Sequence, residues 1–261
     1  MAARYAVYAA PAPGSPLWAF GRAWLGRCAD TGEELAATPL PGFDATALRA
    51  ITEAPRLYGW HATLKPPFAL RDGTTVAELD ADLRALAVRW PAIEVPPLAL
   101  RALDRFLALT PSAACPALAA LAEDCVVALD EFRRPAEAAE LARRRAAGLS
   151  PRQEELLKRY GYPYVLDEFR YHFTLSGPLE PATLAALEDV LAPLVAPFAA
   201  PPHLVDQLAL FQQEDAGRPF TVRARYRLRG VSLPSSATKR STASASGPSL
   251  SNGTTSGSSA P

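Results

Sequence analysis

The chain has 261 residues, of which 49% are hydrophobic and 21% charged, a composition typical of a globular protein. Its 27 basic residues balance its 27 acidic residues, so it lacks the long-range positive potential with which dedicated DNA- and RNA-binding proteins gather phosphates. Small anions held by local contacts are compatible with this balance.

The cysteines and the hydropathy pattern indicate the compartment. Cys28, Cys115 and Cys125 form no CxxC pair, and an odd number of thiols fits a reducing compartment better than a secreted, disulfide-bonded protein. The first residues lack a charged segment followed by a sustained apolar run, and no stretch reaches the roughly 18 uncharged apolar residues of a membrane span. We therefore expect a cytoplasmic protein that is neither secreted nor inserted in a membrane.

Strands are predicted where β-branched, aromatic and other apolar residues lie between turn residues. They are expected over Arg4–Ala9, as a pair within Val95–Thr110 that turns around Ala102–Asp104, and over His203–Phe211 and Pro219–Leu228. Helices are predicted where a capping residue or a first-turn proline precedes apolar residues at helical spacing. They are expected to begin near Ser15, Asp44, Thr75, Leu118, Ser150 and Pro181, the fourth continuing to Phe132. Helices and strands are intermixed without strict alternation, which predicts the α+β class.

The composition changes sharply at residue 231. From Val231 to Pro261 the chain has no aromatic residue and eleven serines, together with scattered glycine and proline. Such a segment cannot bury enough apolar surface to offset the entropy of ordering it. We predict one folded region over residues 1–230 and a disordered tail over residues 231–261.

Two of the three histidines lie in the same tetrapeptide frame, HxTL. The frames are His61-Ala62-Thr63-Leu64 and His172-Phe173-Thr174-Leu175. They also agree outside these four positions, with an aromatic residue three before and one before each histidine and a proline six after it. These flanking residues are Tyr58, Trp60 and Pro67 for the first frame, and Phe169, Tyr171 and Pro178 for the second. The agreement indicates an internal duplication.

Spacing indicates what such a frame can do, because residues two apart in a strand point to the same face. The shared faces are expected to hold His61, Thr63 and Lys65 in the first frame, and Arg170, His172, Thr174 and Ser176 in the second. Two such strands can place two imidazoles and two hydroxyls around one small volume, which suits a phosphate. One imidazole can then accept a proton from an attacking water or hydroxyl while the other protonates the leaving oxygen. Threonine hydroxyls can donate to the non-bridging oxygens, where charge develops.

The paired frames, about 110 residues apart, resemble the 2H phosphoesterase superfamily, whose members act on cyclic phosphodiesters through two HxT/S motifs. The opening strand and the segments Tyr58–Phe68, Gly161–Tyr164 and Phe169–Leu175 are similar to a bacterial branch of phosphonate-metabolism proteins (DUF1045-like), often encoded beside carbon–phosphorus lyase genes. The resemblance covers roughly residues 4–229. It implies two pseudo-symmetric lobes of mixed or antiparallel sheet, with outer helices, that flank a central cleft.

The resemblance implies metal-independent hydrolysis of a small cyclic phosphodiester of ribose, phosphoribose or a nucleotide. His61 and His172 are the expected acid–base pair, in either order, and Thr63 and Thr174 the expected phosphate ligands. Lys65 and Arg170 share the histidine faces and are further candidates for substrate binding, although exposed cations at strand ends are as often solvated. No metal or other cofactor is expected, because neither frame contains Cys, Asp or Glu at ligand spacing.

Two alternatives keep the same site. The substrate can be an RNA end that carries a cyclic phosphate, which the neutral net charge does not favour. The protein can instead be a sensor or scaffold that binds a phosphorylated sugar without turnover. We interpret Cys115, Cys125 and His203 as structural residues. The cluster of Arg133, Arg134 and Arg143–Arg145 could form a basic rim for a polyanionic substrate, but a solvated helix face is the preferred interpretation.

Overall fold

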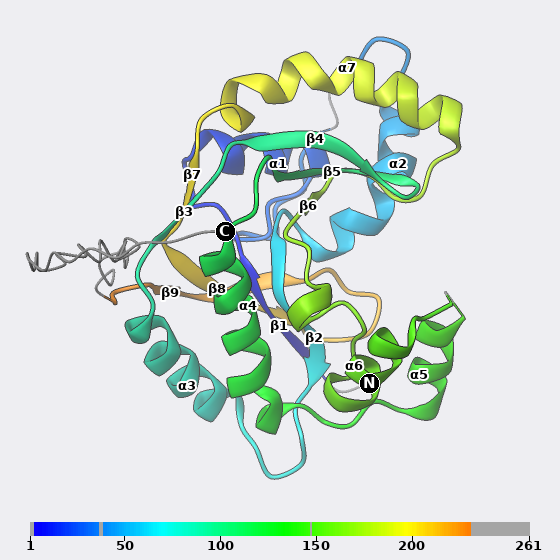
Figure 1. The fold of residues 1–261 in the computed structure, drawn as a ribbon. Coiled ribbons are helices and arrows are strands. Elements are labelled where there is room, and N and C mark those ends of the chain that lie inside the picture. The colour runs from blue at the N-terminus through cyan, green and yellow to red at the C-terminus, as the bar shows by residue number, and fades with distance from the viewer. Residues whose placement is uncertain (1–2, 37–38, 147, 231–261) are drawn as a thin grey trace, which may run out of the picture.

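The computed structural model describes residues 3–36, 39–146 and 148–230, which form a seven-stranded sheet, a two-stranded sheet and the helices that cover them (Figure 1). The strands are β1 (Arg4–Ala9), β2 (Ala62–Ala69), β3 (Ile93–Val95), β4 (Leu98–Leu103), β5 (Phe106–Pro111), β6 (Phe173–Thr174), β7 (His203–Val205), β8 (Gln207–Gln213) and β9 (Thr221–Arg227). The helices are α1 (Pro16–Leu25), α2 (Ala45–Tyr58), α3 (Val76–Arg89), α4 (Pro116–Ala128), α5 (Ala138–Arg145), α6 (Pro151–Tyr160) and α7 (Pro181–Ala199), with short 3-10 turns η1 (Asp130–Phe132) and η2 (Leu166–Glu168). The predicted tail, residues 231–261, lies outside the described residues.

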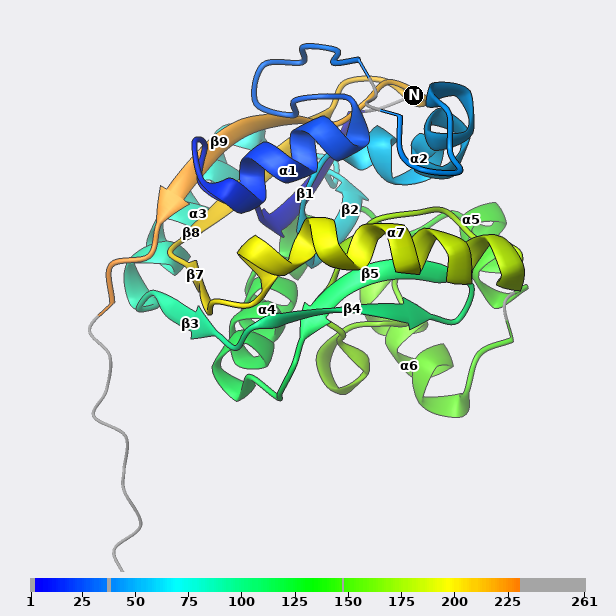
Figure 2. The ribbon, with the colours of Figure 1, turned by 90° about the horizontal axis from the view of Figure 1, so that it is seen from above.

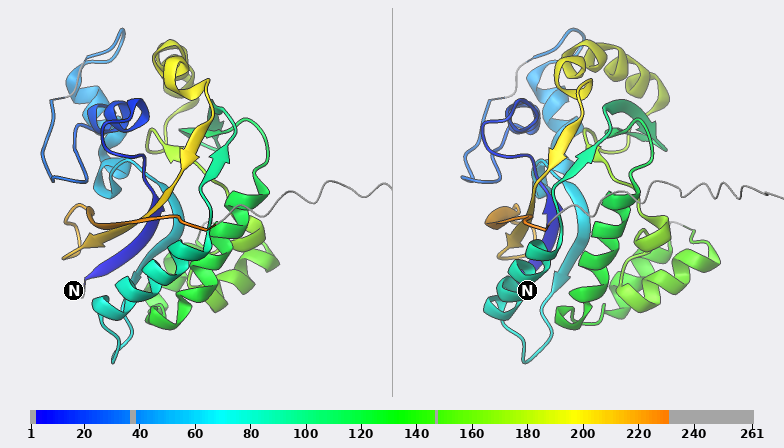
Figure 3. Two further views of the ribbon diagram at one scale, coloured as in Figure 1. Left: turned by 90° about the vertical axis from the view of Figure 1, so that its left-hand side faces the viewer. Right: turned by 60° about the vertical axis from the view of Figure 1, so that its left-hand side comes forward.

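The large sheet has the strand order β4-β5-β6-β2-β1-β8-β9, and each neighbouring pair is antiparallel. The small sheet pairs β3 with β7, also antiparallel. Figure 3 shows β1 and β2 side by side as a strongly curved pair. The predicted α+β class with an antiparallel sheet is confirmed. The large sheet has two flanks, β4-β5-β6 and β2-β1-β8-β9, and each carries one HxTL frame at the junction between them.

The predicted helix starts are confirmed by their caps. Ser15, Asp44, Thr75 and Ser150 each accept a hydrogen bond from a backbone N–H in the first turn, and the last two form full capping boxes. Several boundaries differ from the prediction. The strand expected over His203–Phe211 is divided into β7, in the small sheet, and β8, in the large sheet. The helix expected to reach Phe132 ends at Ala128 and passes into η1. The turn between β4 and β5 consists of Asp104 and Arg105, and Asp104 adopts the left-handed conformation with φ 52° that aspartate tolerates.

The main core lies on one face of the large sheet. Helix α7 lies along β4 and β5, α4 packs on β2, α3 packs on β8 and β9, and α1 lies beside α7 (Figures 1 and 2). Side chains of β1 point alternately to the two faces of the sheet. Tyr5, Val7 and Ala9 belong to the main core. Ala6, Tyr8 and Ala10 join a smaller apolar cluster on the other face, with Phe211 and Phe220.

Helix α7 is, by length and composition alone, long and apolar enough to cross a membrane. It carries Glu188 and Asp189 at its centre and contains Pro193 and Pro197 in its second half. One face of the helix is buried in the core: Leu187, Leu191, Val195 and Ala199. A helix with one buried stripe is the pattern of a helix that packs on the core of a globular domain.

Candidate active site

The two HxTL frames, 111 positions apart in the sequence, are neighbours in the sheet. Strand β2 pairs with β6 through Ala62 and Phe173, the residues that follow the two histidines. His61 and His172 therefore lie directly before the first residues of β2 and β6, one on each side of the β2–β6 junction. Strand β5 supports β6 from its other edge, where Leu109 pairs with Phe173 and Ala108 with Thr174.

Over the four residues of each frame, buried and partly buried side chains alternate as expected, but beyond them the alternation fails, since Lys65 and Ser176 are both buried. The residues on either side of each histidine are buried in the main core: Trp60, Ala62 and Leu64 in the first frame, and Tyr171, Phe173 and Leu175 in the second. The histidines and threonines between them are only partly buried: His61, Thr63, His172 and Thr174. The polar groups of both frames thus lie on the face opposite the main core.

The register through Ala62 and Phe173 relates the two frames by an approximate twofold axis. Continuing it by one residue in each direction sets His61 across from Thr174, and Thr63 across from His172. The two histidines are then diagonal neighbours, a relationship that in antiparallel sheets separates residues by about 7–8 Å. Burial is the main cause that lowers the pKa of His61, and the charge of His172 acts in the same direction. The space between them is suited to one phosphate group.

Both imidazoles are held by the same hydrogen bond. Nδ1 of His61 lies 2.8 Å from the carbonyl oxygen of Gly59, and Nδ1 of His172 lies 2.8 Å from that of Arg170. Since a carbonyl oxygen can only accept, Nδ1 carries the proton in each ring. In the neutral imidazole Nε2 is then the free base, and in His61 it accepts from the Thr63 hydroxyl at 3.2 Å. Each frame therefore presents one Nε2 atom that can accept or return a proton.

His61 lies in an aromatic pocket formed by residues of other elements. Its ring stacks on that of Tyr8 in β1, with centroids 3.7 Å apart and 22° between the planes. The rings of Tyr58 and Phe211 lie at 6.2 and 6.1 Å. Burial lowers the pKa of His61 to about 4, against an opposing contribution from the Gly59 hydrogen bond. The unliganded ring is therefore neutral at pH 7.

His172 is less enclosed. The ring of Phe106, the first residue of β5, lies 5.8 Å away and is tilted by 52°. Burial also lowers the pKa of His172, and the positive charge of Arg170 acts in the same direction. Arg170 itself is exposed. Within residues 3–36, 39–146 and 148–230, its guanidinium has no hydrogen bond or ion pair, so it is available to an anion near His172.

Lys65 is a correction to the sequence prediction. Thr63 pairs with Tyr8 but Lys65 pairs with Val7, so Leu64 is an extra residue and forms a β-bulge. The bulge interrupts the alternation and turns Lys65 to the face of Val7, away from His61. Lys65 is 2% exposed, and its amine donates to the Val126 carbonyl in α4 at 2.9 Å.

The environment of the Lys65 amine is that of a structural group. Asp130 Oδ1 lies 3.7 Å from it, and burial lowers the pKa of the lysine to about 8. The same carboxylate receives two hydrogen bonds from Arg133. The buried lysine thus joins β2 to α4 and η1, and it does not lie with the phosphate-binding candidates.

The arginine cluster of the sequence is mostly occupied by carboxylates. Arg133 pairs with Asp130, Arg144 with Glu140 and Arg145 with Glu154. The expected solvated helix face is only partly right: Arg143–Arg145 lie on α5, but Arg133 and Arg134 precede it, and the Arg133 side chain is only 15% exposed. Among the described residues no three His, Cys, Asp or Glu side chains come together as metal ligands.

Sequence reasoning missed three residues of the site: Tyr8, Gly59 and Phe106. Tyr8 lies in the predicted opening strand, but strand periodicity does not place it beside His61. Gly59 lies in the Tyr58–Phe68 segment and supplies the carbonyl that fixes the His61 ring. Phe106 carries no signal, because its place beside His172 depends on strand pairing between β5 and β6. A glycine two residues before a motif histidine was the one sequence signal available.

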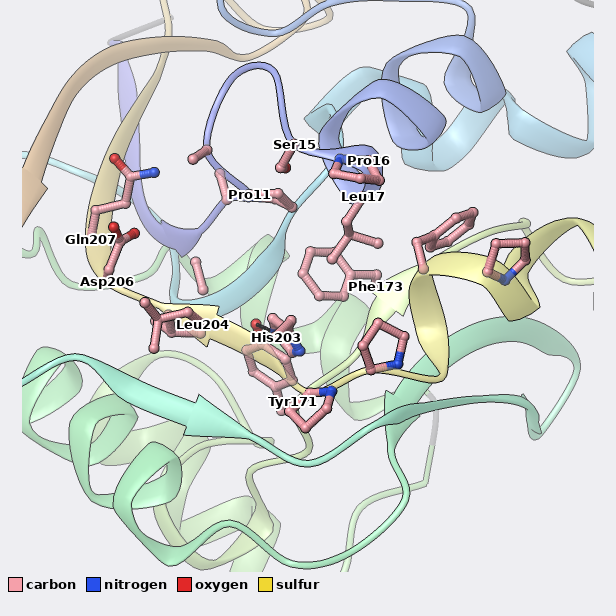
Figure 4. Close-up of a pocket in the computed structure, with 18 residues that line it drawn as sticks. Pro11, Ser15, Pro16, Leu17, Tyr171, Phe173, His203, Leu204, Asp206 and Gln207 are labelled. Carbon is pink, nitrogen blue, oxygen red and sulfur yellow. Dashed lines mark hydrogen bonds between the residues drawn. The ribbon is translucent and has the colours of Figure 1, made fainter.

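A cavity of about 310 Å³ lies on the other side of the motif strands, lined by Tyr171 and Phe173 rather than by the histidines and threonines of the frames (Figure 4). The expected central cleft between the frames is therefore not this cavity.

The chain matches one family model and two curated relatives. A family model described as "Protein of unknown function (DUF1045)" matches residues 63–221. Two curated relatives are both named "Ribose 1,5-bisphosphate phosphokinase PhnN". The one from Janthinobacterium sp. (strain Marseille) is 36% identical over 221 residues, and the one from Laribacter hongkongensis (strain HLHK9) is 41% identical over 219. Each match covers 83% of this chain but 49% and 50% of the relatives, so the chain spans about half their length.

Solved structures show a distant likeness. Escherichia coli LigT complexed with 3'-AMP is 18% identical, with 87% of this chain and 99% of that chain covered and a TM-score of 0.37. A structure described as "Crystal structure of phosphoesterase" is 15% identical, with the same coverage and a TM-score of 0.39.

Proposed function

The chain belongs to the DUF1045 family, and from the matched histidine geometry of its two HxTL frames we propose that it is a metal-independent phosphoesterase that hydrolyses a small cyclic phosphodiester. The observation that carries this proposal is the repeated hydrogen bond: both imidazoles donate Nδ1–H to the carbonyl two residues earlier at 2.8 Å. Two bases fixed in the same tautomer, at diagonal positions of one strand pair, are the elements of two-histidine acid–base catalysis.

The proposed reaction uses the two Nε2 atoms in opposite protonation states. Nε2 of one histidine accepts a proton from water while the water oxygen forms a bond to phosphorus. The ester bond between phosphorus and the leaving oxygen breaks, and Nε2–H of the other histidine gives its proton to that oxygen. Both pKa values are lowered in the unliganded protein. The negative charge of a bound phosphate acts against that lowering and favours the protonated acid.

The remaining site residues have roles in binding the anion. The Thr63 and Thr174 hydroxyls lie on the same face as the histidines and can donate to the non-bridging oxygens, whose charge increases in the transition state. Arg170, exposed beside His172, can add an ionic contact. Lys65 has no role in this proposal, since its amine is occupied by the Val126 carbonyl on the other side of the sheet.

The names of the curated relatives support a phosphorylated ribose as the substrate class, because both are named for ribose 1,5-bisphosphate. The kinase activity in those names is not proposed for this chain. The relatives are about twice as long as the match, and this sequence contains no GxxxxGK[ST] loop for nucleotide phosphates. A cyclic phosphate of phosphoribose, of the kind that carbon–phosphorus lyase chemistry yields, is the substrate that we propose to test first.

The test is phosphorus NMR of the purified protein in EDTA. The panel contains phosphoribosyl 1,2-cyclic phosphate, 2′,3′-cyclic nucleotides and a short RNA that ends in a cyclic phosphate. Turnover of a small cyclic ester is expected for the wild type, with a loss of about 10²-fold or more in His61→Ala and in His172→Ala. Val88→Ala is the control, because Val88 is 57% exposed on α3, lies outside both frames and should leave turnover unchanged.

Each other outcome favours a named alternative. Hydrolysis of the RNA end alone, with binding that weakens steeply as salt rises, would favour RNA-end processing. Shifted or broadened phosphorus signals without turnover would favour a sensor of phosphorylated sugars. Full activity in His172→Ala would contradict the two-histidine mechanism. We also propose that the protein acts in the cytoplasm, which its three free thiols, Cys28, Cys115 and Cys125, support.

A further inference from the structure

The cavity of about 310 Å³ lies behind the second HxTL frame (Figure 4). Its walls come from the end of β1, the loop that leads into α1, the turn between α7 and β7, and the start of β8. Tyr171 and Phe173 form its floor. A volume of this size lies at the lower end of the range for small-molecule sites in proteins.

The lining is apolar and carries almost no charge. Prolines and aliphatic or aromatic side chains dominate it, among them Pro11, Leu17, Phe198 and Val205. No lysine or arginine is among the described residues that line it. Asp206 is the one carboxylate among the described lining residues, and its Oδ2 accepts a hydrogen bond from Arg227 at 2.9 Å. A phosphate or another anion would find no counter-charge here, so the cavity is chemically different from the site between the frames.

One polar pair faces this apolar space. Tyr171 Oη and His203 Nε2 lie 3.1 Å apart, and their rings stack with centroids 5.9 Å apart. The other ring nitrogen, His203 Nδ1, is buried and has no hydrogen-bond partner among the described residues. Burial lowers the pKa of His203 to about 4, so the ring is neutral at pH 7. A buried polar atom without a partner is costly, and a ligand that supplies one hydrogen bond would remove that cost.

The cavity is adjacent to the strand that carries His172. Because faces alternate along a strand, Tyr171 and Phe173 contact the cavity while His172, between them, contacts the candidate active site. Phe173 also stacks on Trp60, which precedes His61. A molecule in the cavity would therefore touch the reverse side of the second frame, and Phe173 joins that frame to the first through Trp60.

We propose that this cavity is a second ligand site, which binds an uncharged, mainly apolar small molecule through a hydrogen bond to His203 Nδ1. The occupant contacts Tyr171 and Phe173 and so reaches the second frame from the face opposite the phosphate. This site does not depend on the proposed phosphoesterase activity, because its lining and its test involve neither turnover nor phosphate.

The test uses benzamide and benzoate as a matched pair of probes. Both have one aromatic ring, but benzamide is neutral and offers a hydrogen-bond donor and acceptor, whereas benzoate is an anion. Titration into protein with isotope-labelled aromatic residues is expected to give saturable shifts at Tyr171, Phe173 and His203 with benzamide, with a Kd on the order of millimolar for so small a probe. Benzoate is expected to bind at least tenfold more weakly.

Variants locate the binding. Ala12→Trp places a large side chain at the exposed rim of the cavity and is expected to abolish the benzamide shifts. Ala119→Trp, on the exposed face of α4, is the control and should bind as the wild type does. His203→Phe keeps a ring in place but removes Nδ1, and is expected to weaken benzamide severalfold. Absence of saturable shifts, equal binding of benzoate, or unchanged binding in Ala12→Trp would each overturn the proposal.

Discussion

Trp60 and Phe173, from different HxTL frames, stack with ring centroids 5.2 Å apart and 24° between their planes. Trp60 directly precedes His61 and Phe173 directly follows His172, so the stack joins the two frames on the side of the sheet opposite the histidines. Gly21 of α1 makes room for the stack, because a Cβ added there would lie 2.0 Å from the Trp60 ring. The stack thus links the two frames on their apolar side.

Replacing Trp60 with alanine is expected to lower the free energy of unfolding by about 3–5 kcal/mol, the cost of removing a large buried aromatic side chain. Urea denaturation measures this change. Val88→Ala is a suitable control, since Val88 is 57% exposed and its truncation should cost less than about 0.5 kcal/mol. A loss of less than about 1 kcal/mol in Trp60→Ala would mean that the stack contributes little to holding the frames together.

Replacing Lys65 with methionine is expected to leave KM for the phosphate ester unchanged, because the amine lies on the core side of β2. The expected effect is on stability, a loss of about 1–3 kcal/mol, because the Val126 carbonyl loses its hydrogen bond. Steady-state kinetics and urea denaturation of the same variant separate the two effects.

Replacing Arg170 with glutamine is expected to have the opposite effects to Lys65→Met, on KM rather than on stability. Arg170 is exposed beside His172, so its loss is expected to raise KM severalfold while the free energy of unfolding changes by less than about 0.5 kcal/mol. If Lys65→Met raised KM and Arg170→Gln did not, the assignment of the two cations would be reversed.

Much of the site could be predicted from the sequence because strand periodicity is local. The alternation of buried and polar residues around His61 and His172, and the capped helix starts, follow from residue spacing alone. Lys65 could not be placed in this way, because alternation fails at the Leu64 bulge. Pro66 and Pro67, which follow, do indicate an irregular strand, since proline in a strand is found mainly at edges and bulges.

Contacts between distant segments could not be predicted. The stack of Tyr8 on His61 depends on the pairing of β1 with β2, and the place of Phe106 depends on the pairing of β5 with β6. No local pattern records which strands become neighbours. The cavity behind Phe173 was missed for the same reason, because its walls come from four separate parts of the chain.

Gly59→Ala is expected to impair both stability and turnover. Gly59 has φ +80°, a conformation that favours glycine, and a Cβ there would lie 2.7 Å from Cβ of Ala29. Its carbonyl also holds the His61 ring, so displacement of this backbone disturbs the base as well as the fold. We expect a loss of more than about 1 kcal/mol in the free energy of unfolding and a reduced kcat.

Gly73→Ala is the matched control for that substitution. Gly73 has φ +84° but nothing lies within 4 Å of an added Cβ, and it is remote from the histidines in sequence and strand position. It should show the cost of the backbone conformation without any change in kcat. Equal kcat in the Gly59 and Gly73 variants would show that the Gly59 carbonyl does not position His61.

The stability of the protein is expected to fall as the pH drops from about 6.5 to about 4, in part because of His203. Its pKa is about 4 in the folded protein, below the ordinary value near 6.5, so within this window the unfolded chain binds the additional proton. The contribution is fully present above pH 6.5 and is lost as the pH falls, with a slope of at most about 1.4 kcal/mol per pH unit. Urea denaturation of the wild type and His203→Gln across this range isolates the effect from the titrating carboxylates, which both proteins share. The free-energy difference between them should change with pH, and a constant difference would show that His203 is protonated as easily in the folded state as in the unfolded chain.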